Sequence, residues 1–136
     1  DTNKCRYWIG LTSAPLKAQG DPALHVAAFR YVTNLDTTAS VGYWRTYTND
    51  GSGAGTVTIT TLPVTPNRRY SFKIATYGNG ATIDSIVFYN NGIRLSNHNT
   101  TNLPALTTGL GYYCMVQTRT TVARNIRIKK IHFESR

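Results

Sequence analysis

The side chains of this chain that could do acid–base, nucleophilic or metal chemistry are few. They are Asp1, Asp21, Asp36, Asp50, Asp84 and Glu134, His25, His98 and His132, and Cys5 and Cys114. No two carboxylates are spaced to lie together on one strand face, as glycoside hydrolysis would need. The sequence has no Gly-x-Ser-x-Gly elbow, and neither cysteine has a local catalytic signature. The sequence therefore predicts a protein that is not an enzyme and that uses no cofactor.

Metal binding is a second chemistry that these residues could support. The three histidines fall on separate predicted strands, where a lone histidine is more often a satisfied surface or core residue than a metal ligand. Asn49-Asp50-Gly51 could lend oxygen atoms to calcium, but a simple turn explains the same three residues equally well. We therefore predict no metal site.

Aromatic, arginine and asparagine side chains are the stronger functional candidates, because they suit binding. An exposed aromatic ring stacks on a sugar ring, and nearby amide and guanidinium groups supply hydrogen bonds. The residues predicted to contact a glycan or a protein partner are Tyr43, Trp44, Arg45, Tyr47, Asn91, Arg94, Tyr112 and Tyr113. The alternative is that most of these rings are core residues or cross-strand pairs.

The chain is strongly basic, with 15 Lys and Arg against 6 Asp and Glu and a formal net charge of +9. An acidic partner is therefore worth considering: nucleic acid, an anionic glycan or an acidic protein surface. Nucleic acid is not the expected partner, because no RNP-type, zinc-finger or helix-turn-helix pattern accompanies the charge. Many of the basic residues alternate with apolar ones, so solvated strand faces account for them without a ligand.

Alternation of apolar and polar residues predicts strands along the whole chain. The predicted strands are Cys5–Thr12, His25–Val32, Tyr43–Thr48, Gly55–Thr61, Arg68–Tyr77, Ser85–Tyr89, Ile93–Leu95, Leu110–Arg119 and Asn125–Glu134. Short strands at this spacing, without a helical period, predict an all-β, antiparallel two-sheet sandwich or jelly roll.

The centre of the chain has the clearest pattern. Asn91-Gly92 between two apolar runs predicts a hairpin with a primed turn, because both residues tolerate positive φ. Alternation around this hairpin predicts that Phe72 and Phe88 both point into the core. Replacing either by alanine should then cost about 3–5 kcal/mol.

The last predicted strand combines a buried apolar face with a basic exposed one. Its apolar set is Ile126, Ile128, Ile131 and Phe133, and its outward set is Arg127, Lys129 and His132. Lys130 is predicted to be the extra residue of a β-bulge.

A chain of 136 residues is expected to form one domain. We expect no membrane insertion, because no apolar run could span a bilayer and no leader precedes the first strand. The chain starts without methionine and enters a strand almost at once, so we expect it to be the C-terminal module or a fragment of a longer chain. Cys5 and Cys114 are expected to be two half-buried thiols, although a bridge between neighbouring strands is an alternative.

The order of these segments resembles a known family. From about His25 onward, the stretches HVAAFRYVTN, YWRTYTNDGSG, LPVTPNRRYSFKI, SIVFYNNGIRL and the tail from NTTNLP to IKKIHFES follow one another. Together they resemble the concanavalin A-like (laminin G-like) jelly-roll domain of bacteriophage virion proteins. The chain departs from that pattern at Asn90, where the family has an apolar residue, and at Asn97-His98-Asn99, where the exit is one residue longer.

The resemblance implies a non-catalytic virion module, which decorates a capsid or forms part of a tail or fibre. Its implied partners are other virion proteins and further copies of itself, with a trimer as the expected homo-oligomer, at the virion surface or outside the cell. The alternative function is that of a lectin-like adhesion module, which recognises host or extracellular glycans, including anionic ones. Fold analogy carries the virion expectation, and the aromatic and polar residues above carry the lectin alternative, so a site has to decide between them.

Overall fold

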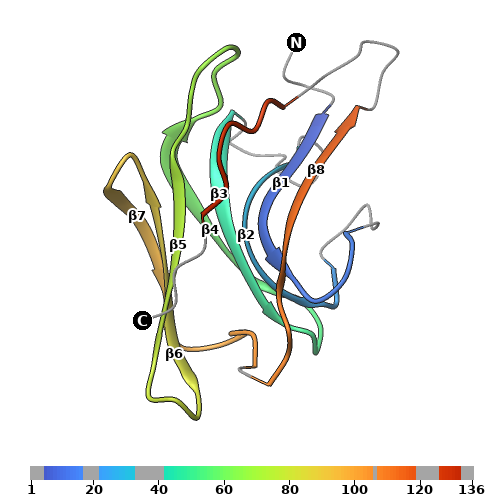
Figure 1. Cartoon of the computed structure of the whole chain (residues 1–136), viewed down its shortest axis with the longest axis vertical. Helices are drawn as coiled ribbons and strands as arrows, with labels where there is room; N and C mark the ends of the chain where they lie inside the picture. The colour runs from blue at the N-terminus through green and yellow to red at the C-terminus, as the bar shows by residue number, and fades with distance from the viewer. Residues whose placement is uncertain (1–4, 17–21, 33–41, 106, 119–125, 133–136) are drawn as a thin grey trace.

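Strands dominate the part of the chain that the computed structural model describes, which is residues 5–16, 22–32, 42–105, 107–118 and 126–132 (Figure 1). These residues contain no helix and eight strands: β1 (Cys5–Thr12), β2 (His25–Val32), β3 (Tyr43–Asp50), β4 (Thr56–Pro63), β5 (Phe72–Gly78), β6 (Ile83–Asn90), β7 (Ile93–His98) and β8 (Gly111–Thr118). Accordingly, no helix among them could cross a membrane. The all-β prediction is confirmed.

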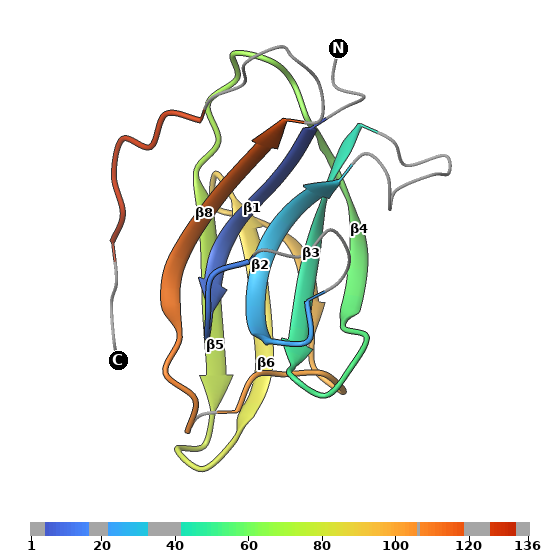
Figure 2. The same ribbon diagram turned by 90° about the vertical axis from the view of Figure 1, so that its right-hand side faces the viewer.

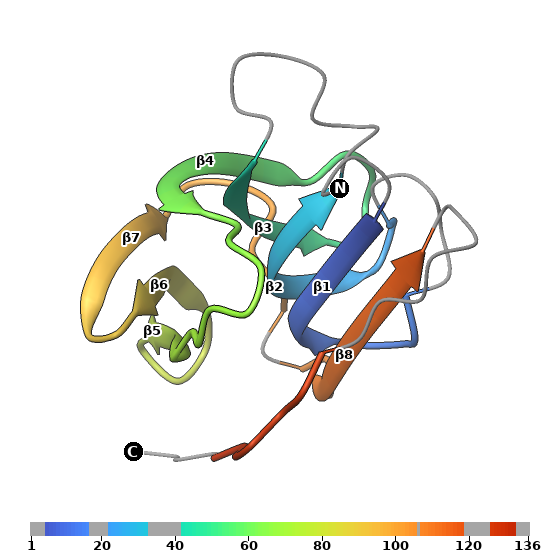
Figure 3. The same cartoon turned by 90° about the horizontal axis from the view of Figure 1, so that it is seen from above.

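The described strands form two antiparallel sheets. The large sheet has the order β4-β3-β2-β1-β8, and the small sheet has the order β5-β6-β7. The two sheets face each other across a common interior (Figure 3). The predicted two-sheet sandwich is therefore confirmed, while its finer jelly-roll connectivity stays a prediction.

The β6–β7 hairpin forms as its sequence predicts. Asn90 pairs with Ile93, and the two residues between them are Asn91, with φ of 50°, and Gly92, with φ of 80°. Positive φ at both central positions is the signature of the primed turn, whose twist matches that of the flanking strands.

The main core lies between the sheets and is built on aromatic rings. Phe29 of β2 stacks on Phe72 of β5, with ring centroids 4.1 Å apart, and meets Phe88 of β6 edge to face at 5.3 Å. Trp44 of β3 joins this cluster through an edge-to-face contact with Phe72 at 4.9 Å. These contacts span both layers, so they tie the two sheets together.

The large sheet is also covered on its outer face. Trp8, Val26, Ala28 and Tyr47 form a second buried cluster there, together with Leu16, which follows β1. Trp8 is thereby buried on the outer face of β1.

The C-terminal strand prediction is wrong for the residues that the structure describes. Residues 126–132 belong to neither sheet, and Ile128 and Ile131 are 45% and 46% exposed rather than buried. A strand needs a neighbour to satisfy its backbone groups, and alternation along the sequence does not supply that neighbour. Asn125, Phe133 and Glu134 of the predicted strand lie outside the described residues.

Gly10 lets β1 approach β2 closely, and this gives a testable prediction. A Cβ atom at Gly10 would lie 2.6 Å from Ala28 Cα and nearer still to the carbonyl oxygen of Ala27. Because backbone atoms cannot rotate away, we expect Gly10→Ala to lower the free energy of unfolding by about 1–3 kcal/mol in denaturant titrations. Gly109→Ala is the control, since nothing lies within 4 Å of a Cβ there. Equal losses in the two variants would contradict this explanation.

Candidate functional site

Three of the predicted contact residues are buried in β3. Trp44 lies in the main core, Tyr47 lies in the outer cluster of the large sheet, and Arg45 is 7% exposed. Tyr47 also donates a hydrogen bond from its hydroxyl to the carbonyl oxygen of Pro22, at 3.3 Å. A ligand could reach these three side chains only if their neighbours moved.

Three other predicted contact residues, Tyr43, Tyr112 and Tyr113, lie in strands of the large sheet. Tyr112 and Tyr113 are adjacent in β8, so they point to opposite faces of the large sheet. Burial raises the pKa of Tyr112 to about 12, whereas Tyr113 donates a hydrogen bond to the carbonyl oxygen of Leu16 at 3.3 Å. Tyr43 is 38% exposed at the start of β3.

The two remaining predicted residues, Asn91 and Arg94, lie on the exposed β6–β7 hairpin of the small sheet. The strand register places Arg94 of β7 opposite Tyr89 of β6, and Lys73 of β5 opposite Tyr89 on its other side. Phe72 and Phe88 face the core, so alternation turns Lys73, Tyr77 and Tyr89 outward. We call Lys73, Tyr77, Tyr89 and Arg94 the tyrosine face.

The tyrosine face is exposed, aromatic and cationic. Lys73 Nζ lies 5.8 Å from the centroid of the Tyr89 ring, within the range of a cation–π contact. A hydrogen bond with Tyr77 raises the pKa of the Tyr89 hydroxyl, and the nearby Arg94 charge opposes this shift. The Tyr89 phenol therefore stays protonated at neutral pH and can donate a hydrogen bond beside two positive charges. Such a surface suits an anionic or hydroxyl-rich partner.

A second polar group, which the sequence did not reveal, lies between the sheets. His98 of β7 is 3% exposed, and its Nε2 and Nδ1 atoms hydrogen-bond to the hydroxyls of Thr46 at 2.9 Å and Thr48 at 2.8 Å. The Thr46 hydroxyl also lies 2.7 Å from the Ser96 hydroxyl. Burial lowers the pKa of His98 to about 4, so the imidazole is neutral at pH 7.

This hydroxyl–imidazole group links β7 of the small sheet to β3 of the large sheet. It holds a histidine beside hydroxyls, as a nucleophile–base pair does, but Ser96 and Thr46 are buried. The sequence signal for this group was weak. Thr46 and Thr48 share one strand face, and Ser96 and His98 share another, but the sequence of neither strand predicts that the two faces pack together.

Side-chain oxygens of the Asn49-Asp50-Gly51 turn accept hydrogen bonds from residues of the same turn and from Ser52. The Asn49 side-chain oxygen accepts from the Gly51 amide at 2.8 Å, and one Asp50 oxygen accepts from the Ser52 amide and hydroxyl at 2.9 Å and 2.6 Å. The Ser52 bonds lower the pKa of Asp50. The described residues hold no cluster of three or more histidine, cysteine or acidic side chains. Cys5 and Cys114 are both free thiols.

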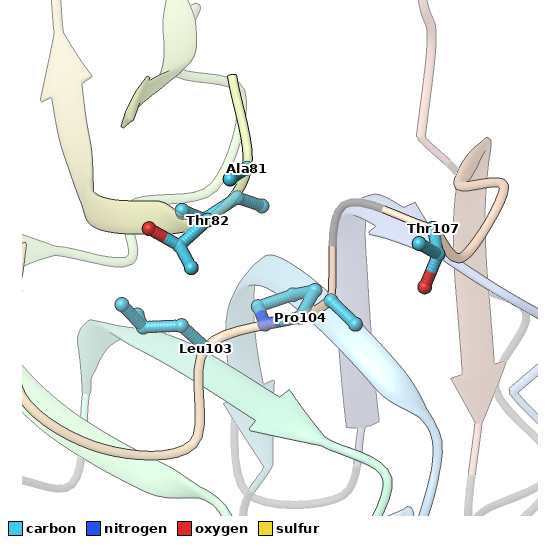
Figure 4. Close-up of a pocket in the computed structure, with 7 residues that line it drawn as sticks. Ala81, Thr82, Leu103, Pro104 and Thr107 are labelled. Carbon is cyan, nitrogen blue, oxygen red and sulfur yellow. The ribbon is translucent and has the colours of Figure 1, made fainter. Parts of the chain in front are cut away.

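A pocket of about 260 Å³ lies between the turn that links β5 to β6 and the stretch leading to β8 (Figure 4). Its lining residues are Ala81, Thr82, Ile83, Leu103, Pro104, Ala105 and Thr107. All of these side chains are neutral, so the pocket offers no group for proton transfer or for holding an ion. The tyrosine face is therefore the better candidate site.

Comparison with known proteins found no matching family model, no matching curated protein and no matching solved structure.

Proposed function

We propose that this chain is a non-enzymatic contact module of a virion, a single jelly-roll domain that decorates a capsid or belongs to a tail or fibre. The observation that supports the contact role is the tyrosine face, which presents two phenols and two cations on the outer surface of the small sheet. Tyrosine and arginine are enriched where proteins bind each other. The virion assignment is supported by the order of the segments from HVAAFRYVTN to IKKIHFES.

The positive net charge of the chain indicates what kind of partner it binds. A chain with a formal charge of +9 is attracted to acidic surfaces, which speeds association and favours acidic partners over basic ones. We therefore propose an acidic patch on another virion protein as the surface that the tyrosine face meets, in a homo-oligomer at the virion surface or outside the cell.

A lectin-like adhesion module is the second candidate function. The same face favours it, because Tyr77 is 51% exposed and its ring is free to stack on a sugar, while Lys73 and Arg94 suit carboxylate or sulfate groups. Anionic glycans are the class of ligand that this combination would take.

Two measurements on the purified chain separate these functions: retention on immobilised neutral and anionic glycans, and the mass in solution. Sugar-dependent retention of a monomer would favour the lectin. A stable oligomer without a sugar response would favour the virion role, and an image that locates the chain on an intact particle would test that role directly.

The tyrosine face itself is tested by Arg94→Ala. We expect this variant to weaken binding to the partner or glycan about tenfold, since a charged contact at an interface core is commonly worth more than 1 kcal/mol. Arg68→Ala removes the same charge from the loop before β5, where Arg68 lies over the ring of Tyr70, and it serves as the control. Equal weakening by both variants would mean that net charge matters and the tyrosine face does not.

A further inference from the structure

The small sheet covers only part of the large sheet. The inter-sheet contacts join β5 and β6 to β2 through the rings of Phe72, Phe88 and Phe29, and β7 to β3 through Ser96 and Thr46. The inward residues of β1 and β8, such as Ile9 and Val116, remain half-buried. No described strand joins β5 to β8, and the two strands lie apart in the view from above (Figure 3); we call this side of the sandwich the open side.

The β5 strand borders this open side and is an edge of its sheet. Among the described strands it pairs with β6 alone, so its other side presents a row of backbone donors and acceptors without a strand partner. Such an edge is a template for another strand. A strand added there would face the inward residues of β1 and β8 and extend the buried interior, whereas one added at β8 would widen the uncovered part.

Residues 126–132 have the sequence pattern of a strand that could be added at the β5 edge. They pass in front of the open side without joining either sheet (Figures 1 and 3). Ile128 and Ile131 are about half exposed, and basic residues stand between them. An extended segment with this pattern gains from pairing, because pairing satisfies its backbone and buries its isoleucines.

Strand direction decides which copy of the segment fits the β5 edge. In Figure 2 the β5 arrow points down, and residues 126–132 also run downward beyond the upward-pointing β8. Docked on its own β5, the segment would form a parallel pair, although every observed strand pair is antiparallel. A second copy related by a two-fold axis perpendicular to the strands presents its β5 in the opposite direction. Pairing between the two copies is then antiparallel, the more stable arrangement.

We propose that two copies of this chain exchange their C-terminal segments, so that residues 126–132 of each copy add a fourth strand to the β5 edge of the other. The exchange is reciprocal, as a two-fold interface requires. It leaves the tyrosine face of each copy exposed, because that face lies on the outer surface of the small sheet. It also predicts a dimer, where the family resemblance implies a trimer.

Charge opposes this association, since each copy carries a formal net charge of +9 and residues 126–132 include Arg127, Lys129 and Lys130. The contact is made by backbone pairing and apolar burial, so added salt screens the repulsion and should strengthen the dimer. A dimer that instead dissociates as salt rises would be held by ion pairs and would overturn the proposal.

The test compares two double variants of the full chain by mass in solution. Arg127→Pro with Lys130→Pro removes backbone donors that point to opposite sides of the segment, so strand pairing fails in either register. Arg127→Ala with Lys130→Ala removes the same charges and keeps both donors. We expect the alanine variant to remain a dimer, like the unmodified chain, and the proline variant to become a monomer with an unchanged β-sheet circular dichroism spectrum.

Amide hydrogen exchange then locates the contact. Exchange should be slower in the unmodified chain than in the proline variant at residues 72–78 and 126–132, and equal in both at 111–118. Slower exchange at 111–118 would place the segment on β8 and overturn the proposal. A monomeric unmodified chain, a trimer, or a proline variant that stays dimeric would overturn it as well.

Discussion

Phe88→Ala is expected to lower the free energy of unfolding by about 3–5 kcal/mol. Phe88 is fully buried, and its ring meets Phe29 edge to face at 5.3 Å and lies 5.2 Å from the His98 ring. Truncation would leave a cavity between the sheets, lined by β2 on one side and by β7 on the other. Domains of this size are stable by only about 5–15 kcal/mol, so the variant should show a clearly lower denaturant midpoint.

Phe72→Ala is the matched control for this prediction. Phe72 stacks on Phe29 at 4.1 Å, but it is only partly buried at the start of β5. Its truncation removes less area from contact with the core, so the loss should be smaller than for Phe88. The sequence predicted a loss in the same range for the two residues. The two truncations are compared in the Arg127→Pro, Lys130→Pro background, where the proposed dimer cannot cover the open side, and an equal or larger loss at Phe72 there would contradict this explanation.

The sequence predicted the bounds of a strand well where alternation or a turn within that segment defines them. Both ends of β1 and β2 match their predictions, and the β6–β7 turn follows from Asn91 and Gly92 alone. These features depend on alternation and on the φ preferences of single residues, which any one strand carries in its own sequence. The antiparallel sandwich then follows from the number of strands and from the short links between them.

The C-terminal segment shows that a strand pattern in the sequence does not identify the strand with which it pairs. Ile126, Ile128 and Ile131 alternate nearly as well as the inward residues of β5, yet only β5 has a neighbour in the structure. Pairing is a property of two segments, so a pattern in one of them predicts a strand without saying where the partner is. The half-exposed isoleucines mark a segment whose partner lies elsewhere, in our proposal on a second copy.

The candidate site was predicted in part. Arg94 and Asn91 lie on or beside the tyrosine face, whereas Trp44 and Tyr47 are buried because β3 is covered on both faces. The sequence could not distinguish an outward tyrosine from one beneath a loop, since both alternate in the same way. Alternation places Lys73 and Tyr77 on the face of their strand opposite Phe72, and this alternation was the available signal for the site.

Stability is expected to fall by as much as about 3 kcal/mol as the pH is lowered from 7 to 4, because of His98. The buried imidazole has a pKa of about 4, against 6.5 for an ordinary histidine. Between these values the unfolded chain takes up a proton that the folded chain does not, so protonation favours unfolding. The contribution is complete above pH 6.5, declines through the window and changes little below pH 4. Denaturant titrations at several pH values measure it.

His98→Gln separates this effect from the titration of other groups. A glutamine amide can donate and accept hydrogen bonds but does not titrate, so it can replace part of the pairing with Thr46 and Thr48. At pH 7 the variant should be less stable by about 1–2 kcal/mol, because one buried hydroxyl loses an optimal partner. Its stability should then be nearly flat down to pH 4, so the falling curve of the unmodified chain should cross it before that pH. Parallel pH curves for the two proteins would show that carboxylates such as Asp50 control the acid sensitivity, and that the imidazole between the sheets does not.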